Sequence, residues 1–196
     1  SFFHFVKPQW PSDSFFSDGF PWVEWKFPQP YHNRSKVMNV TVASHPMVPM
    51  SFSLTRKNWN WINWGRGWNP ETKTNEAENV DKGTFFQAQW DHVIASAPPI
   101  VSVGGWNEWI AYKQLYDGEY MLCDAVNKEY SRDIEPMVGG YEDAFYLQLI
   151  ANIHRYKGIT GEPMVYPPQA INQSMIDTQW KSVRYTVRNT DHRFMD

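Results

Sequence analysis

The chain has 196 residues, with 18 basic and 21 acidic side chains, a net charge of −3 and a mean hydropathy of −0.59. This balance excludes the strongly basic surface that nucleic acids and anionic membranes attract. The sequence contains no apolar run near the roughly 18 residues of a membrane span, and its single cysteine, Cys123, excludes an intramolecular disulfide. With 12 Phe, 11 Trp and 10 Tyr, the sequence is too aromatic for a disordered chain.

The first 82 residues predict few regular elements. Two short aromatic runs, residues 2–6 and 20–25, are weak strand candidates. The β-branched run at 37–43 is a better one, and it stops at a Ser-His-Pro turn. Residues 46–82 show neither a helical nor a strand period, and a loop of this length within a compact domain is commonly functional.

A helix, a tight turn and a strand follow directly. The helix is predicted from Thr84 to about residue 97, with Trp90 in its packing face, and two prolines end it. Residues 100–103 form a short apolar strand, so this order is half of a βαβ unit and predicts a parallel sheet. The clearest helix spans residues 142–157, with one apolar stripe, an acidic first turn and a glycine stop.

The end of the chain has a different pattern. Residues 162–178 are rich in Pro and Gln, and residues 180–188 alternate between apolar and polar side chains, as a strand with one buried face does. We therefore predict an α/β fold in which residues 1–161 form the C-terminal part of a (β/α)8 TIM-type barrel. Residues 162–196 would form a linker and the first strand of a β-rich, sandwich-like domain. Since the sequence begins without methionine and stops just after this strand, we expect it to be a piece of a longer protein.

The sharpest candidate site follows the strand at 100–103, at the strand end where α/β folds place their chemistry. A carboxylate, Glu108, lies there next to an amide and two indoles: Trp106, Asn107 and Trp109. Indole faces pack on sugar rings, and a glutamate serves as acid, base or nucleophile in glycoside chemistry. In the alternative interpretation, Glu108 is a buried structural partner of an arginine such as Arg56 or Arg66.

Further aromatic residues extend this candidate site. The combination of indole and acid recurs in Trp22, Glu24 and Trp25. His45 follows the predicted strand at 37–43 and is the histidine that we expect near a pocket. The tryptophans at 58–68 form either a sugar-binding platform or the apolar filling of their own loop. The remaining aromatic candidates for sugar binding are Trp61, Trp64 and Tyr112.

Other site chemistries have no support in the sequence. The six histidines show no ligand spacing, so no metal site is predicted. Nucleotide-binding motifs are absent, so no cofactor is predicted either. An acid-rich run spans residues 124–136. For Glu129 and Asp133 the pattern favours a solvated loop with local ion pairs, whereas Asp124 and Glu135 are equally compatible with contacts to a substrate.

Three stretches carry a resemblance to a known family: Trp-Asn-Glu-Trp at 106–109, the run at 127–137 and the helix at 146–158. Together they resemble the endo-α-mannosidase-like, family 99 type of glycoside hydrolases and their WbsX-like relatives, over roughly residues 20–158. The resemblance implies the C-terminal part of a catalytic (β/α)8 barrel and a retaining hydrolase. It also implies that Glu108 assists the neighbouring 2-hydroxyl group of the reacting sugar. The family's general acid, three residues further on, is here replaced by Ala111.

Hydrolysis of a glycosidic bond needs two carboxyl groups, roughly 5–10 Å apart. Either another acid supplies the proton, with Glu24, Asp124 and Glu135 as the candidates, or the chemistry differs, or the activity is lost. The leading hypothesis is thus a hydrolase that cleaves an oligosaccharide or polysaccharide, in the extracellular or periplasmic location that the resemblance implies. The alternatives are a glycan-binding protein without catalysis that retains the tryptophan-lined cleft, and a purely structural protein.

Overall fold

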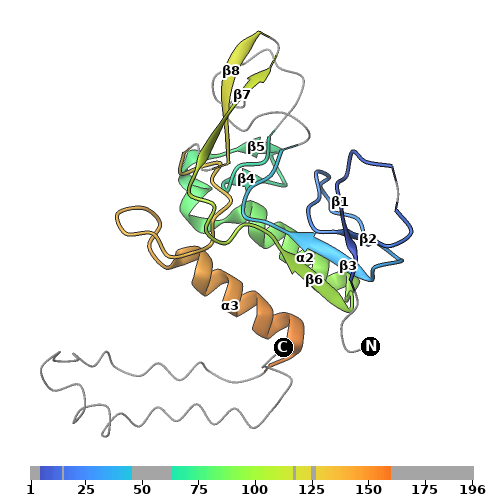
Figure 1. Cartoon of the computed structure of the whole chain (residues 1–196). Helices are drawn as coiled ribbons and strands as arrows, with labels where there is room; N and C mark the ends of the chain where they lie inside the picture. The colour runs from blue at the N-terminus through green and yellow to red at the C-terminus, as the bar shows by residue number, and fades with distance from the viewer. Residues whose placement is uncertain (1–4, 15, 46–62, 117, 125–126, 160–196) are drawn as a thin grey trace, which may run out of the picture. The chain divides into compact units, whose positions relative to one another are not determined.

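The computed structural model describes residues 5–14, 16–45, 63–116, 118–124 and 127–159 (Figure 1). All of them belong to the first of the two units into which the chain divides, residues 1–160. The predicted linker and strand over 162–196, the first part of the loop at 46–82 and the candidate Trp61 lie outside the described residues.

The centre of the described fold is a βαβ unit (Figure 1). Strands β3 (Val37–Val40) and β6 (Ile100–Val103) pair in parallel, and helix α2 (Thr84–Ser96) lies between them in the chain. The predicted helix, the predicted strand at 100–103 and the parallel pairing are therefore confirmed. The carboxyl ends of the two strands lie side by side, which places the segments that follow them next to each other.

Strand β3 is three residues shorter than predicted, because a side chain of α2 binds the backbone of Thr41. Gln89 donates from Nε2 to the carbonyl of Thr41 (2.6 Å) and accepts its N–H at Oε1 (3.2 Å). These bonds satisfy a peptide group that would otherwise pair with a neighbouring strand. Gln89 is buried, so it fixes the point at which β3 ends.

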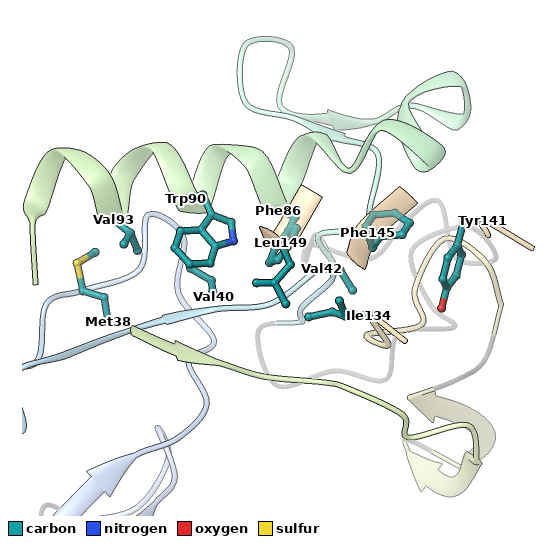
Figure 2. Close-up of a cluster of buried hydrophobic side chains, with 10 residues drawn as sticks. All are labelled: Met38, Val40, Val42, Phe86, Trp90, Val93, Ile134, Tyr141, Phe145 and Leu149. Atoms are coloured by element: carbon teal, nitrogen blue, oxygen red, sulfur yellow. The ribbon is translucent and has the colours of Figure 1, made fainter. Parts of the chain in front are cut away.

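Two helices cover β3 with one apolar core (Figure 2). Side chains of β3, α2 and α3 (Ala144–Lys157) meet there, among them Met38, Val40, Phe86, Trp90, Phe145 and Leu149. Trp90 is 1% exposed, which confirms its predicted role in helix packing. Each such side chain contributes roughly 1.5–3 kcal/mol relative to its exposure in water, so this core holds the βαβ unit together.

Helix α3 confirms the helix predicted over 142–157 but begins two residues later. Glu142 has a φ of 48°, outside the helical range, and Asp143 is the N-cap. Gly158 adopts a left-handed conformation with a φ of 65°, and its N–H donates to the carbonyl of Arg155 (3.2 Å). The predicted glycine stop is therefore confirmed.

The main difference from the sequence analysis is a β-hairpin at residues 111–124, where no regular element was predicted. Strands β7 (Ala111–Tyr116) and β8 (Glu119–Asp124) pair antiparallel, with Tyr116 opposite Glu119. The two residues between the strands are Asp-Gly, a sequence that favours a tight hairpin turn, and Gly118 has a φ of 77°. The sequence therefore contained the hairpin signal.

Short elements make up the rest of the described fold. The described part of the loop at 46–82 contains β4 (Trp68–Asn69), β5 (Thr74–Asn75) and the 3₁₀ helix η1 (Ala77–Lys82). Near the N-terminus, β1 (Lys7–Gln9) and β2 (Gly19–Pro21) pair in parallel. The strand prediction at 20–25 is confirmed at residues 20–21 and wrong at 22–25, because β2 ends at Pro21. The prediction at 2–6 is wrong at residues 5–6, because β1 begins at Lys7.

Within the described residues the strands form four two-stranded sheets. The (β/α)8 barrel therefore stays a prediction. No helix in this part of the chain is long and apolar enough to cross a membrane.

Candidate functional site

The segment that follows β6 is held against the end of β3 and against residue 132. The N–H of Gly104 donates to the carbonyl of Val40 (2.9 Å). Gly105 has a φ of 77°, and a Cβ at this position would overlap the carbonyl oxygen of Arg132. The conformation and the close approach both require glycine. The two glycines thus set the direction in which the chain reaches Glu108.

Glu108 is fixed by its backbone and leaves its carboxylate at the surface. Its N–H donates to Oδ1 of Asp133. Its side chain is 57% exposed, with Oε2 3.4 Å from Nη2 of Arg132. The interpretation of Glu108 as a buried partner of Arg66 is therefore wrong: the carboxylate is open, and its ion pair is with Arg132. Arg56 lies outside the described residues.

Arg66 instead holds the loop that positions Glu108. It is fully buried and donates from Nε to the carbonyl of Ser131 (2.7 Å) and from Nη2 to the carbonyl of Asp133 (2.7 Å). Its guanidinium lies over the ring of Tyr141 at 4.0 Å. Burial lowers the pKa of Arg66, with Tyr141 and Asp133 acting in the opposite direction. The hydrogen bonds replace the water that the guanidinium loses.

Asp133 is the second part of this support. The prediction of a solvated position is wrong for it, since Asp133 is 1% exposed. Its Oδ2 accepts the hydroxyl of Ser131 (2.7 Å), and its Oδ1 accepts the N–H of Glu108. Glu129 in the same run is partly buried, and burial raises the pKa of its carboxyl. The buried carboxylate of Asp133 therefore orders the chain around Glu108.

Glu24 is buried, in contrast to Glu108, and it is 8% exposed. Its Oε1 accepts the backbone N–H groups of Trp25 (2.8 Å) and Lys26 (3.1 Å), and its Oε2 lies 3.1 Å from Nε2 of His32. The backbone carbonyl of Glu24 accepts the hydroxyl of Ser44, which follows β3 (3.3 Å). This contact ties the Glu24 segment to the carboxyl end of the parallel strands.

Glu24 and Glu108 line the same cavity. Its volume is about 50 Å³, and its wall includes Trp22, Asn39, Gln89, Gly105 and Arg132. A cavity of this size accommodates water, whose share of liquid volume is about 30 Å³, but not a sugar ring. A sugar that reaches Glu108 must therefore lie at the mouth of the cavity, over the exposed side of the carboxylate.

A second and larger cavity adjoins the first. Its volume is about 610 Å³, and it shares Val23, Glu24 and Lys26 with the small cavity. Its remaining lining comes from residues between 9 and 35, in β1, β2 and the loops next to them. Ligand sites typically measure roughly 300–1,000 Å³, so this cavity has the size of a ligand site. A third cavity, of about 670 Å³ and lined in part by Trp64 and Trp68, has a similar size but shares no residue with the small cavity.

The other predicted site residues are spread over the surface. Asn107 is exposed next to Glu108, and Trp106 is 45% exposed with its ring edge-to-face against Tyr146 of α3 (5.9 Å). Trp109 donates from Nε1 to Oε2 of Glu135 (2.7 Å). Neither indole lines the cavity that Glu24 and Glu108 share.

Apart from Trp22, the remaining predicted aromatic residues that the structure describes do not line the small cavity. Trp25 stacks on His45, with ring centroids 6.0 Å apart. Trp64 stacks on Phe85 at 6.0 Å and 2°, so it packs against α2. Tyr112 is 59% exposed on β7. Asp124 is the last residue of β8, and its side chain lies outside the described part of the chain.

Several residues that build the site were not predicted as site residues from the sequence. Asn39 interrupts a buried apolar strand, and Gln89 interrupts the buried face of α2, so both were visible as polar residues at core positions. His32 and Arg132 gave no such signal. The carboxylates that they contact, Glu24 and Glu108, lie 8 and 24 positions away in the sequence.

Among the described residues, no group of three or more His, Cys, Asp and Glu side chains is arranged to hold a metal ion. No family model matches the chain, and neither the curated proteins nor the solved structures contain a significant match to it.

Proposed function

We propose that the protein is a glycoside hydrolase that uses Glu108 and Glu24 as its pair of carboxylates. The observation that carries the proposal is that both side chains line one cavity beside the carboxyl ends of β3 and β6. Glycosidases place two carboxyl groups across the scissile bond. The resemblance around Trp-Asn-Glu-Trp implies the sugar-assisting role for Glu108, and the shared cavity favours Glu24 over Glu135 as the acid.

Glu108 has the environment of a group that meets substrate. Its carboxylate is exposed, its N–H is fixed by Asp133, and Arg132 lies 3.4 Å from Oε2. This arrangement holds the carboxylate at the cavity mouth, where it can take a proton from a sugar hydroxyl group. Arg132 supports the orientation of the carboxylate.

We assign the role of proton donor to Glu24, because it is the other carboxylate that lines the small cavity. The N–H groups of Trp25 and Lys26 donate to Oε1, and Oε2 lies 3.1 Å from Nε2 of His32. In its protonated form, Glu24 would pass a proton to the oxygen of the leaving sugar. The side chain of His32 is 28% exposed and lines the larger cavity, so it can return a proton from solvent. The small cavity between the two carboxylates has room for the water that hydrolysis consumes.

A glycan-binding protein without catalysis is the second candidate, and two observations favour it. Glu24 already has three hydrogen-bond partners, as a structural carboxylate does. The position of the family's acid is Ala111, the first residue of β7. Such a protein would keep the tryptophan-rich surface and bind sugars without cleaving them.

The test is hydrolysis of α-linked manno- and gluco-oligosaccharides by the full-length protein, measured as released reducing ends. Glu108→Gln and Glu24→Gln are each expected to lower turnover by at least about 100-fold, with binding retained. Glu78→Gln is the matched control, because Glu78 is exposed in η1. Binding without any turnover in the wild type would favour the second candidate. Unchanged turnover in Glu108→Gln would remove Glu108 from the reaction.

A further inference from the structure

We infer that the larger cavity, of about 610 Å³, binds additional neutral sugar rings of the same oligosaccharide that reaches Glu108. The inference rests on the proposed function and names the substrate class: a glycan longer than a disaccharide. Its residues lie between positions 9 and 35, mostly outside the motifs that indicated a site in the sequence. The inference depends on one observation: Glu24 lines both this ligand-sized cavity and the small cavity that contains Glu108.

One wall of the cavity is a loop tied together by Gln9. This buried side chain donates from Nε2 to the carbonyls of Trp10 (3.1 Å) and Ser14 (3.3 Å), and it accepts the N–H of Phe16 at Oε1 (2.9 Å). The loop connects β1 and β2, whose parallel pairing fixes both of its ends. The wall is thus preformed, which lowers the entropy cost of binding a ligand.

A second part of the lining is a turn that begins at Pro30 and returns to β3. The N–H of His32 donates to the carbonyl of Val37 (3.0 Å), and the N–H of Lys36 donates to the carbonyl of His32 (2.8 Å). Pro21, which also lines the cavity, is anchored by Asn39 of β3, which donates from Nδ2 to the carbonyl of Pro21 (2.8 Å). Backbone and buried side-chain bonds therefore hold the cavity open around its sides.

Aromatic side chains give the cavity surfaces for sugar rings. Trp10 and Tyr31 both line it and are 41% and 37% exposed. Trp10 contacts Trp22 edge-to-face, with centroids 4.7 Å apart at 79°, so the contact fixes the indole without stacking the two rings. Trp22 in turn lines the small cavity beside Glu108. An aromatic path therefore connects the two cavities.

The charges of the cavity fit a neutral polyhydroxylated ligand. Asp13 faces the same space as Lys26 and Arg34, so neither sign of charge dominates the lining. Glu24 and His32 bind each other there. A polyanion would meet Asp13 and Glu24, and a cation would meet the lysine and the arginine, whereas sugar hydroxyl groups bind both kinds of side chain. The lining thus favours a neutral sugar over a phosphorylated or acidic one.

The two cavities share Val23, Glu24 and Lys26. A sugar in the larger cavity and a sugar over Glu108 would therefore lie on two sides of Glu24. The binding energy of the outer rings would be available to hold the reacting ring in place. Longer oligosaccharides should then bind more tightly than a disaccharide.

The test uses full-length protein carrying Glu108→Gln, which is expected to remove turnover, and compares α-linked mannobiose with mannotetraose by titration calorimetry. Mannotetraose is expected to bind at least about tenfold more tightly. Trp10→Ala and Tyr31→Ala, each added to Glu108→Gln, should each remove most of this advantage while changing mannobiose binding less than about twofold. Tyr120→Ala is the control, because Tyr120 is 69% exposed on β8. If Trp10→Ala disturbs folding, Tyr31→Ala still tests the inference, because Tyr31 lines the same cavity.

Three results would overturn the inference. The variants could lose affinity equally for both sugars, neither variant could lose affinity for mannotetraose, or mannotetraose could fail to bind at all. Length-dependent binding without turnover in the wild-type protein would refute the proposed hydrolase and leave the inference standing. Turnover that depends on Glu108, with no effect of Trp10 or Tyr31 on the longer sugar, would refute the inference alone.

Discussion

Two segments of the molecule contribute to the candidate site in different ways. The segment after β6 carries the recognisable sequence, yet Trp106 and Trp109 are 45% and 40% exposed and lie outside the small cavity. The segment at 9–35 contains none of the three motifs that carry the family resemblance, yet it supplies Glu24 and the lining of the larger cavity. The motif therefore indicated Glu108 as the candidate residue, whereas the concave surface results from contacts between parts of the chain that are distant in the sequence.

Among the variants that test this comparison, we expect the largest effect on stability from a substitution of Arg66. Arg66→Met should lower the free energy of unfolding by about 3–5 kcal/mol, because it leaves the buried carbonyls of Ser131 and Asp133 without their donor. Urea unfolding measures it, and Arg155→Met is the control, since Arg155 is 53% exposed and should contribute about 1 kcal/mol or less. Similar stabilities for the two variants would contradict the assigned role of Arg66.

Gly105 tests how closely the segment after β6 must approach residue 132. Gly105→Ala should cost about 2 kcal/mol or more beyond Gly139→Ala. Both glycines have positive φ values, 77° and 71°, but only at Gly105 would a Cβ overlap a backbone carbonyl. Thermal unfolding of the two variants separates the overlap from the backbone strain. Equal costs would show that the approach to Arg132 is not tight.

His32 tests the role of the N-terminal segment in the reaction. His32→Gln keeps a hydrogen-bonding group next to Oε2 of Glu24 but cannot relay a proton. We expect turnover to fall roughly tenfold with little change in the Michaelis constant, and His154→Gln on α3 to leave both unchanged. A change confined to the Michaelis constant would make His32 a binding residue.

Glu129 gives the smallest expected effect. Burial raises the pKa of its carboxyl, so the folded protein holds this proton more tightly than the unfolded chain. Stability from this group is present below the unfolded pKa and is lost as the pH rises through the folded pKa. Glu129→Gln should therefore raise the unfolding midpoint slightly at pH 7.5 and not at pH 4. A lower midpoint at pH 7.5 would mean that the ionised carboxylate is stabilising.

The elements that the sequence predicted well are those that depend on local pattern. Helix α2, helix α3 and strand β6 follow from periodicity and from their proline and glycine boundaries. The parallel pairing followed from the order of the elements. The β7–β8 hairpin was not predicted, although the Asp-Gly sequence between its strands is a local turn signal.

The parts of the site that escaped prediction depend on distance along the chain. Asp133 has the composition of a solvated loop residue, and its burial results from Arg66, which lies 67 positions away. Glu24 was predicted as a candidate, but its pairing with His32 and its shared cavity with Glu108 required the fold. Sequence pattern indicates residue chemistry, whereas long-range packing decides which residues meet.

The central claim is that Glu24 and Glu108 act together on one glycosidic bond. The most direct measurement is the turnover of α-linked mannotetraose by wild-type protein, Glu24→Gln, Glu108→Gln and the double variant. The account predicts a loss of at least about 100-fold in each single variant and little further loss in the double variant. Wild-type turnover in Glu24→Gln, alongside an inactive Glu108→Gln, would contradict the claim.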